Sequence, residues 1–71
     1  MKYLILMSDG DETFYDLKDI NKIRSEYAQN LDQEVDLKQM DVRPLVMLTV
    51  IYFNNGSTAA YRTADLEMYF D

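Results

Sequence analysis

The chain has 71 residues, no cysteine and no histidine, and its 13 acidic and 7 basic residues give a net charge of −6. This length allows one domain, residues 1–71, with a small core. The composition excludes disulfides and disfavours zinc and haem sites, and the negative charge disfavours direct binding to nucleic acid or to an anionic membrane.

No segment has the pattern of a membrane span or of a secretion signal. The longest apolar run, Leu45 to Phe53, is far shorter than the ~20 residues that a helix needs to cross a bilayer. The run at positions 3–7 is too short for the apolar region of a signal peptide. We therefore expect a cytoplasmic protein without a membrane partner.

The first predicted element is a hairpin over residues 2–15. Asp9-Gly10 is a favoured pair for a two-residue type I′ loop, which needs a positive φ at both positions. With that loop, Leu6 lies opposite Thr13 on a mixed face. Ile5 then lies opposite Phe14 on an apolar face, as expected for a half-buried hairpin.

Residues 16–31 show the spacing of an amphipathic helix. Asp16 is a candidate N-cap for this helix. No glycine or proline interrupts the segment. The apolar positions are spaced by three, three, four and four residues, at Leu17, Ile20, Ile23, Tyr27 and Leu31.

Residues 33–44 have no clear periodicity. Val35 and Leu37 alternate with polar residues, and the apolar positions that follow are out of phase. We interpret the segment as a long acidic loop that either lacks regular structure or contains a short edge strand. The acids in or beside it are Asp32, Glu34, Asp36 and Asp41.

A second hairpin is predicted over residues 45–62. The apolar run 45–53 is rich in β-branched and aromatic residues, which favour a buried strand. Asn55-Gly56 predicts another two-residue type I′ loop, followed by a return strand at 57–62. In that register Ala59 and Tyr61 share a face with Val46, Leu48, Val50 and Tyr52. The opposite face carries Leu45, Met47, Ile51 and Phe53.

The C-terminal segment fits two structures. Thr63 could cap a short helical turn, whereas Leu66, Met68 and Phe70 alternate with polar neighbours as in a strand. We favour the strand. The predicted fold is therefore α+β: an antiparallel sheet in ββαββ order, with a fifth strand or helical turn at the C-terminus and one helix packed on one face.

No motif in the chain predicts a catalytic, metal or cofactor site. The carboxylates of Asp9, Asp11 and Glu12 lie in one turn, but their spacing does not form an EF-hand loop. Acidic residues are also common in turns for backbone reasons. Without histidine, the serines have no evident base. We predict a protein that is not an enzyme and has no cofactor.

Two surfaces are candidates for binding a partner protein. The first is acidic and includes two tyrosines that stand beside acids, because tyrosine is enriched in interface cores. Its residues are Asp9, Asp11, Glu12, Tyr15, Asp32, Glu34, Asp36, Asp41 and Tyr69. The second is the apolar sheet face with Leu45, Met47, Ile51 and Phe53, which one helix cannot cover if it packs on the other face.

In size and charge the chain resembles the small acidic inhibitors of phages and mobile elements, including anti-CRISPR and anti-restriction proteins. The resemblance implies a protein that blocks a basic nucleic-acid-binding surface of a host defence enzyme, in some members by DNA mimicry. The alternative is a self-associating structural or regulatory protein, a homodimer through the second apolar face. The expected partner is accordingly a basic protein or a second copy of the chain.

Overall fold

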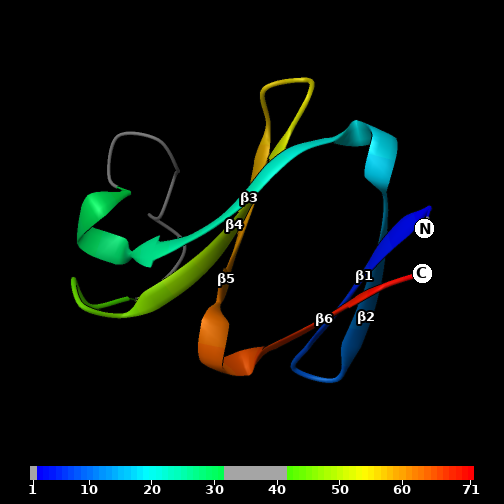
Figure 1. Ribbon diagram of the computed structural model, residues 1–71. Helices are drawn as coiled ribbons and strands as arrows, with labels where there is room; N and C mark the ends of the chain where they lie inside the picture. The colour runs from blue at the N-terminus through cyan, green and yellow to red at the C-terminus, as the bar shows by residue number, and fades with distance from the viewer. Residues whose placement is uncertain (1, 32–41) are drawn as a thin grey trace.

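The computed structural model describes residues 2–31 and 42–71, and in these ranges the chain forms six strands and three short 3₁₀ turns (Figure 1). The strands make two antiparallel sheets of three strands each, in the orders β2-β1-β6 and β3-β4-β5, which we call the first and second sheet. The elements are β1 (Tyr3–Ser8), β2 (Asp11–Asp16), η1 (Leu17–Asp19), β3 (Ile20–Tyr27), η2 (Ala28–Asn30), β4 (Met47–Phe53), β5 (Thr58–Arg62), η3 (Thr63–Asp65) and β6 (Leu66–Phe70).

The chain passes between the sheets at two corners. Figure 1 shows η1 leading from β2 into β3 and η3 leading from β5 into β6. The expected α+β fold with a packed helix is wrong, because the segment predicted as that helix forms η1, β3 and η2. Within the described ranges, no helix has the length and hydropathy to span a bilayer.

A bulge explains why the apolar residues of β3 have the spacing expected of a helix. Ile20 pairs with Phe53, but the next paired residue is Lys22, so one residue is extra on this strand. In a regular strand, residues three apart point to opposite faces. The bulge turns Ile20 and Ile23 to the same face, where both pack between the sheets. Asp16 is an N-cap, but of the 3₁₀ turn η1 and not of a helix. The Asp16 carboxylate accepts a hydrogen bond from the Lys18 amide at 3.1 Å.

The turn and the register of the first hairpin form as predicted, but the buried face is the mixed face with Leu6 and not the apolar face with Ile5 and Phe14. Asp9 and Gly10 have φ values of 52° and 83°, as a type I′ loop requires. Leu6 pairs with Thr13, and Ile5 with Phe14. The C-terminal segment is also a strand as favoured: β6 pairs antiparallel with β1 and completes the first sheet.

The second hairpin forms with a different loop from the predicted one. The Phe53 carbonyl accepts a hydrogen bond from Gly56 N–H at 3.0 Å, and Phe53 N–H donates to the backbone carbonyl of Ser57 at 2.9 Å. The loop therefore has three residues and ends at Gly56, whose φ is 89°, while Asn55 has no positive φ. The register shifts by one residue, so Ala59 and Tyr61 lie on the face of Ile51 rather than on that of Val50.

Among the residues that the structure describes, two apolar clusters make the core, one on each face of the second sheet. Leu4, Leu6 and Ile51 are buried between the sheets. Leu48 and Val50 are buried on the other face, against Ala28 and Leu31 around η2. Because β4 is buried on both faces, its sequence is almost continuously apolar. Each such side chain stabilises the fold by ~1.5–3 kcal/mol relative to exposure.

Candidate functional site

The outer face of the first sheet is the candidate site, because neither core cluster includes its side chains. The strand registers place nine residues on it in three rows across β2, β1 and β6. The central row is Phe14, Ile5 and Tyr69. The flanking rows are Glu12, Met7 and Glu67 on one side, and Asp16, Tyr3 and Asp71 on the other.

The apolar members of these rows form a cross. Three aromatic side chains remain open to solvent: Tyr3 is 42% exposed, Phe14 56% and Tyr69 49%. We call the set Tyr3, Ile5, Met7, Phe14 and Tyr69 the outer patch. Exposed aromatic groups that are contiguous, unlike scattered ones, usually mark an interaction surface.

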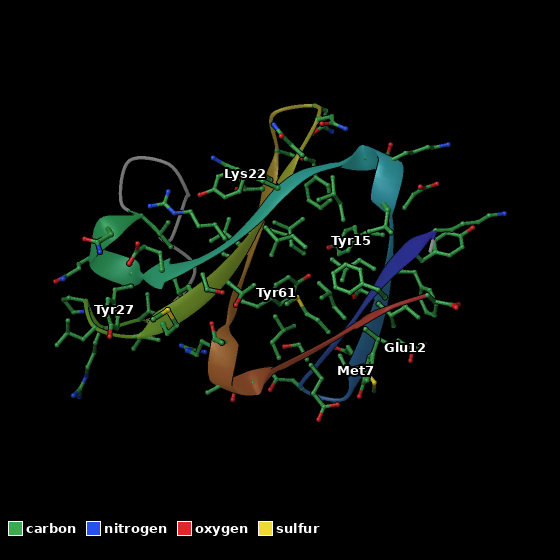
Figure 2. All side chains as sticks on the ribbon, in the orientation of Figure 1. Met7, Glu12, Tyr15, Lys22, Tyr27 and Tyr61 are labelled. Carbon is green, nitrogen blue, oxygen red and sulfur yellow. The ribbon has the colours of Figure 1, made fainter. Side chains whose placement is uncertain are left out.

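Four carboxylates stand at the corners of the outer patch. They are Glu12, Asp16, Glu67 and Asp71, and we call them the corner acids. Figure 2 shows Met7 and Glu12 together on the first sheet. An apolar centre with a charged rim is the usual anatomy of a protein interface, and here all four rim groups have the same sign.

These acids also explain why this face points outward. Burying it would take carboxylates such as Glu12 and Glu67 out of water, at a cost of several kcal/mol each without a cationic partner. The opposite face carries Leu4 and Leu6, which are both fully buried. The sheet therefore buries this inner face at β1, while Met68 and Phe70 on its β6 part remain exposed, and the aromatic and acidic outer face stays in water.

Local contacts hold two of the corner acids in place. Tyr69 donates its hydroxyl to Glu67 Oε2 at 2.7 Å, and this hydrogen bond raises the pKa of Tyr69 above its ordinary value. Asp16 lies 3.7 Å from Lys18 Nζ, an exposed ion pair that contributes little to stability. The outer patch thus keeps a net negative rim.

The residues predicted to form one acidic surface lie in several parts of the chain. Glu12 and Tyr69 lie on the outer face described above. Asp9 and Asp11 are exposed in and beside the β1–β2 loop. The remaining acids predicted for this surface fall at positions outside the described residues, namely Asp32, Glu34, Asp36 and Asp41.

Tyr15 points away from the outer patch, into the space between the sheets. Its hydroxyl lies 3.1 Å from that of Tyr61, and its ring centroid lies 5.0 Å from that of Phe53. Figure 2 shows Tyr15 and Tyr61 between the two sheets. Burial, with the hydrogen bond to Tyr15, raises the pKa of the Tyr61 hydroxyl. This placement makes Tyr15 a contact between the two sheets.

The four residues of the predicted apolar interface do not share one open surface. Ile51 is fully buried and Phe53 is half-buried against the first sheet. Only Leu45 and Met47 are exposed. The face expected to need a second molecule is instead covered by the first sheet of the same chain, so a partner cannot contact Ile51 in the folded protein.

Sequence reasoning missed most of the outer patch, although a signal was present. The predicted register already placed Ile5 opposite Phe14 on an apolar face. On the same face of β2 stand Glu12 and Asp16, whereas the Tyr15 face of this strand has one acid, Asp11. The number of carboxylates per face would have indicated which face stays in water.

No group of three or more acids within 2–31 and 42–71 is placed to hold a metal ion. An open groove of about 560 Å³ is lined by Tyr15, Asp16, Asp19, Phe53, Asn54, Asn55 and Ser57. Its one serine, Ser57, donates its hydroxyl to the Asn55 side chain at 2.6 Å rather than to a base.

In the comparisons with known proteins, no family model, no curated protein and no solved structure matches this chain.

Proposed function

We propose that the protein is a non-enzymatic binding protein whose outer patch docks on a basic surface of a partner protein. The observation that carries the proposal is the cross centred on the Phe14–Ile5–Tyr69 row, which has three exposed aromatic side chains and an acid at every corner. Aromatic anchors of this kind supply most of the energy of protein interfaces. The rim would direct them to a positively charged site.

The charge distribution supports a basic partner over a second copy of the chain. The chain has a net charge of −6, and two outer patches brought face to face would bring corner acids of both copies together. Like charges juxtaposed in an interface cost several kcal/mol. A nucleic-acid-binding surface has the complementary charge. We propose that the protein is an inhibitor that covers the nucleic-acid-binding surface of an enzyme.

A photo-crosslinking experiment tests the proposal. A photoreactive phenylalanine analogue replaces Phe14 in one preparation and Asn55, an exposed residue of the β4–β5 loop, in a matched control. In a lysate of cells that produce the protein, we expect the Phe14 probe to capture a basic protein that the Asn55 probe does not. The captured protein is then purified, and its affinity is measured directly.

Two sets of variants decide the outcome with the purified partner. Phe14→Ala should weaken binding by about thirtyfold, as expected for an interface hot spot. Reversing Glu12 and Glu67 to lysine should weaken it mostly through the association rate, and the effect should shrink as salt rises. Equal capture by both probes, or a Phe14 probe that crosslinks only a second copy, would overturn the proposal.

A further inference from the structure

The free edge of β6 is a second surface that the proposed function does not use. β6 is the last strand of the first sheet, and in the described residues its outer side has no strand partner. Tyr3 and Asp71 exchange both backbone hydrogen bonds. Because such pairs alternate along antiparallel strands, Tyr69 and Glu67 also bond to β1. The amide and carbonyl groups of Met68 and Phe70 therefore point outward.

β6 lacks the protection that several charges, or charges and a bulge, give to the edge strands β2 and β3. Natural edge strands usually carry charges or bulges that discourage pairing with another strand. β2 has three acids, and β3 has charged residues together with its bulge. β5 has two alanines and no large exposed apolar side chain. In β6 the only charge is Glu67, while Met68 is 38% and Phe70 53% exposed.

Acidic residues at both ends of the β6 edge favour an added strand that carries positive charge at its ends. Asp65 precedes β6 and Asp71 follows it, and both are exposed. If two copies paired symmetrically about Met68, Asp65 at the end of η3 in each copy would come close to Asp71 of the other, which is destabilising. A strand with a lysine or arginine at each end would instead place a cation opposite each acid.

We propose that β6 accepts an extended segment of the partner as an added antiparallel strand, with an apolar centre and a basic residue at each end. This mode of recognition combines backbone hydrogen bonds, which provide affinity, with alternating side chains, which provide specificity. The inference rests on the proposed function for the partner's basic character. The surface itself is separate, because it consists of the strand edge and not the sheet face.

The experiment uses a synthetic peptide as the probe. It is long enough to span 65–71, has blocked ends, carries lysine at both ends and alternates valine with threonine between them. In the antiparallel register its valines face Leu66, Met68 and Phe70, and its lysines face the two acids. Binding to the full-length protein is followed by calorimetry. Hydrogen exchange should show new protection at the amides of Met68 and Phe70.

A proline substitution tests the strand edge with a matched control. Met68→Pro removes an amide that points outward, so the ladder to β1 stays intact, as edge positions allow. Met68→Ala removes the same side chain and keeps the amide. We expect Met68→Pro to bind the peptide about tenfold more weakly than Met68→Ala, because an edge hydrogen bond is lost.

Two further measurements keep the result decisive. N-methylation of the edge-facing amides of the peptide should abolish binding to the unchanged protein, which covers the case that Met68→Pro does not fold. Replacing the peptide's lysines by glutamates should also abolish it. Equal affinity of the methylated peptide, or protection of Met68 that rises with protein concentration alone, would overturn the proposal. Phe14→Ala changes the outer patch and should leave peptide binding at the β6 edge unchanged. A failure of the proposed function of the outer patch would therefore be distinguishable from a failure of the β6 proposal.

Discussion

The two hairpins of the molecule contain similar loop sequences and close in different ways. The β1–β2 loop has Asp9-Gly10 and is a two-residue type I′ turn. The β4–β5 loop has Asn55-Gly56, an equally favoured pair, yet Asn54 joins it in a three-residue loop. Gly56 takes the positive φ that such a loop needs at its last position, and Asn55 does not.

The difference arises from a contact outside the second hairpin. Asn54 N–H donates to the Asp19 carbonyl at 2.9 Å, and its side-chain amide donates to the Lys18 carbonyl at 2.8 Å. Both acceptors belong to η1, so the loop is attached to the corner between the sheets. Two net hydrogen bonds stabilise by ~1–3 kcal/mol together, which is enough to decide between two loop types that are both common.

The consequence for the two hairpins differs as well. In the first hairpin the local signal sets the register. In the second, one extra loop residue moves Ala59 and Tyr61 to the opposite face. Tyr61 thereby reaches the space between the sheets, where its hydroxyl meets that of Tyr15. The contact between Tyr15 and Tyr61 therefore depends on the three-residue β4–β5 loop, which is attached to η1.

The largest expected effect tests which face of the first hairpin carries the core. Leu6→Ala should lower the free energy of unfolding by ~2–5 kcal/mol, because Leu6 is fully buried between the sheets. Phe14→Ala, on the outer face of the same hairpin, should change it by less than about 0.5 kcal/mol. Urea denaturation measures both. Similar losses for the two variants would show that both faces of the first sheet are covered.

A deletion converts the second loop into the type of the first. Removing Asn54 leaves Asn-Gly between Phe53 and Ser57, so the strand register is kept while the turn becomes type I′. We expect a loss of ~1–3 kcal/mol from the two hydrogen bonds to η1. Asn54→Ala is the control and should lose ~0.5–1.5 kcal/mol, since only the side-chain bond disappears.

The backbone couplings of Asn55 provide the structural readout for that deletion. They should report a negative φ in the unchanged protein and a positive φ after Asn54 is removed. If the deletion cost no more than the alanine substitution, the attachment to η1 would not be what selects the loop.

The smallest expected effect is a difference between the two loops on substitution by glycine. Asp9→Gly should change the free energy of unfolding by less than about 0.5 kcal/mol, because Asp9 already has a positive φ that glycine adopts freely. Asn55→Gly should cost ~0.5–1.5 kcal/mol, since the Asn55 side chain accepts from the Ser57 amide at 2.9 Å. Thermal unfolding distinguishes them, and equal losses would indicate that the two loops are of one type.

Local sequence determined the parts of this protein where short-range chemistry is sufficient. The Asp9-Gly10 pair set the first hairpin and its register, and alternation at 66–70 indicated the last strand. The apolar run 45–53 predicted a buried strand. Two residues of the outer face, Glu12 and Tyr69, were predicted from the sequence to bind a partner. Acids and neighbouring tyrosines can be identified as candidate interface residues from their residue type alone.

Only the tertiary structure decided the rest. The segment 16–31 has helical spacing, but pairing with β4 makes most of it a bulged strand, since ladder hydrogen bonds and burial outweigh a weak local propensity. The attachment of Asn54 to η1 selected the second loop. The outer patch formed only when β6 paired with β1, because residues distant in sequence then lay side by side on one face of the first sheet.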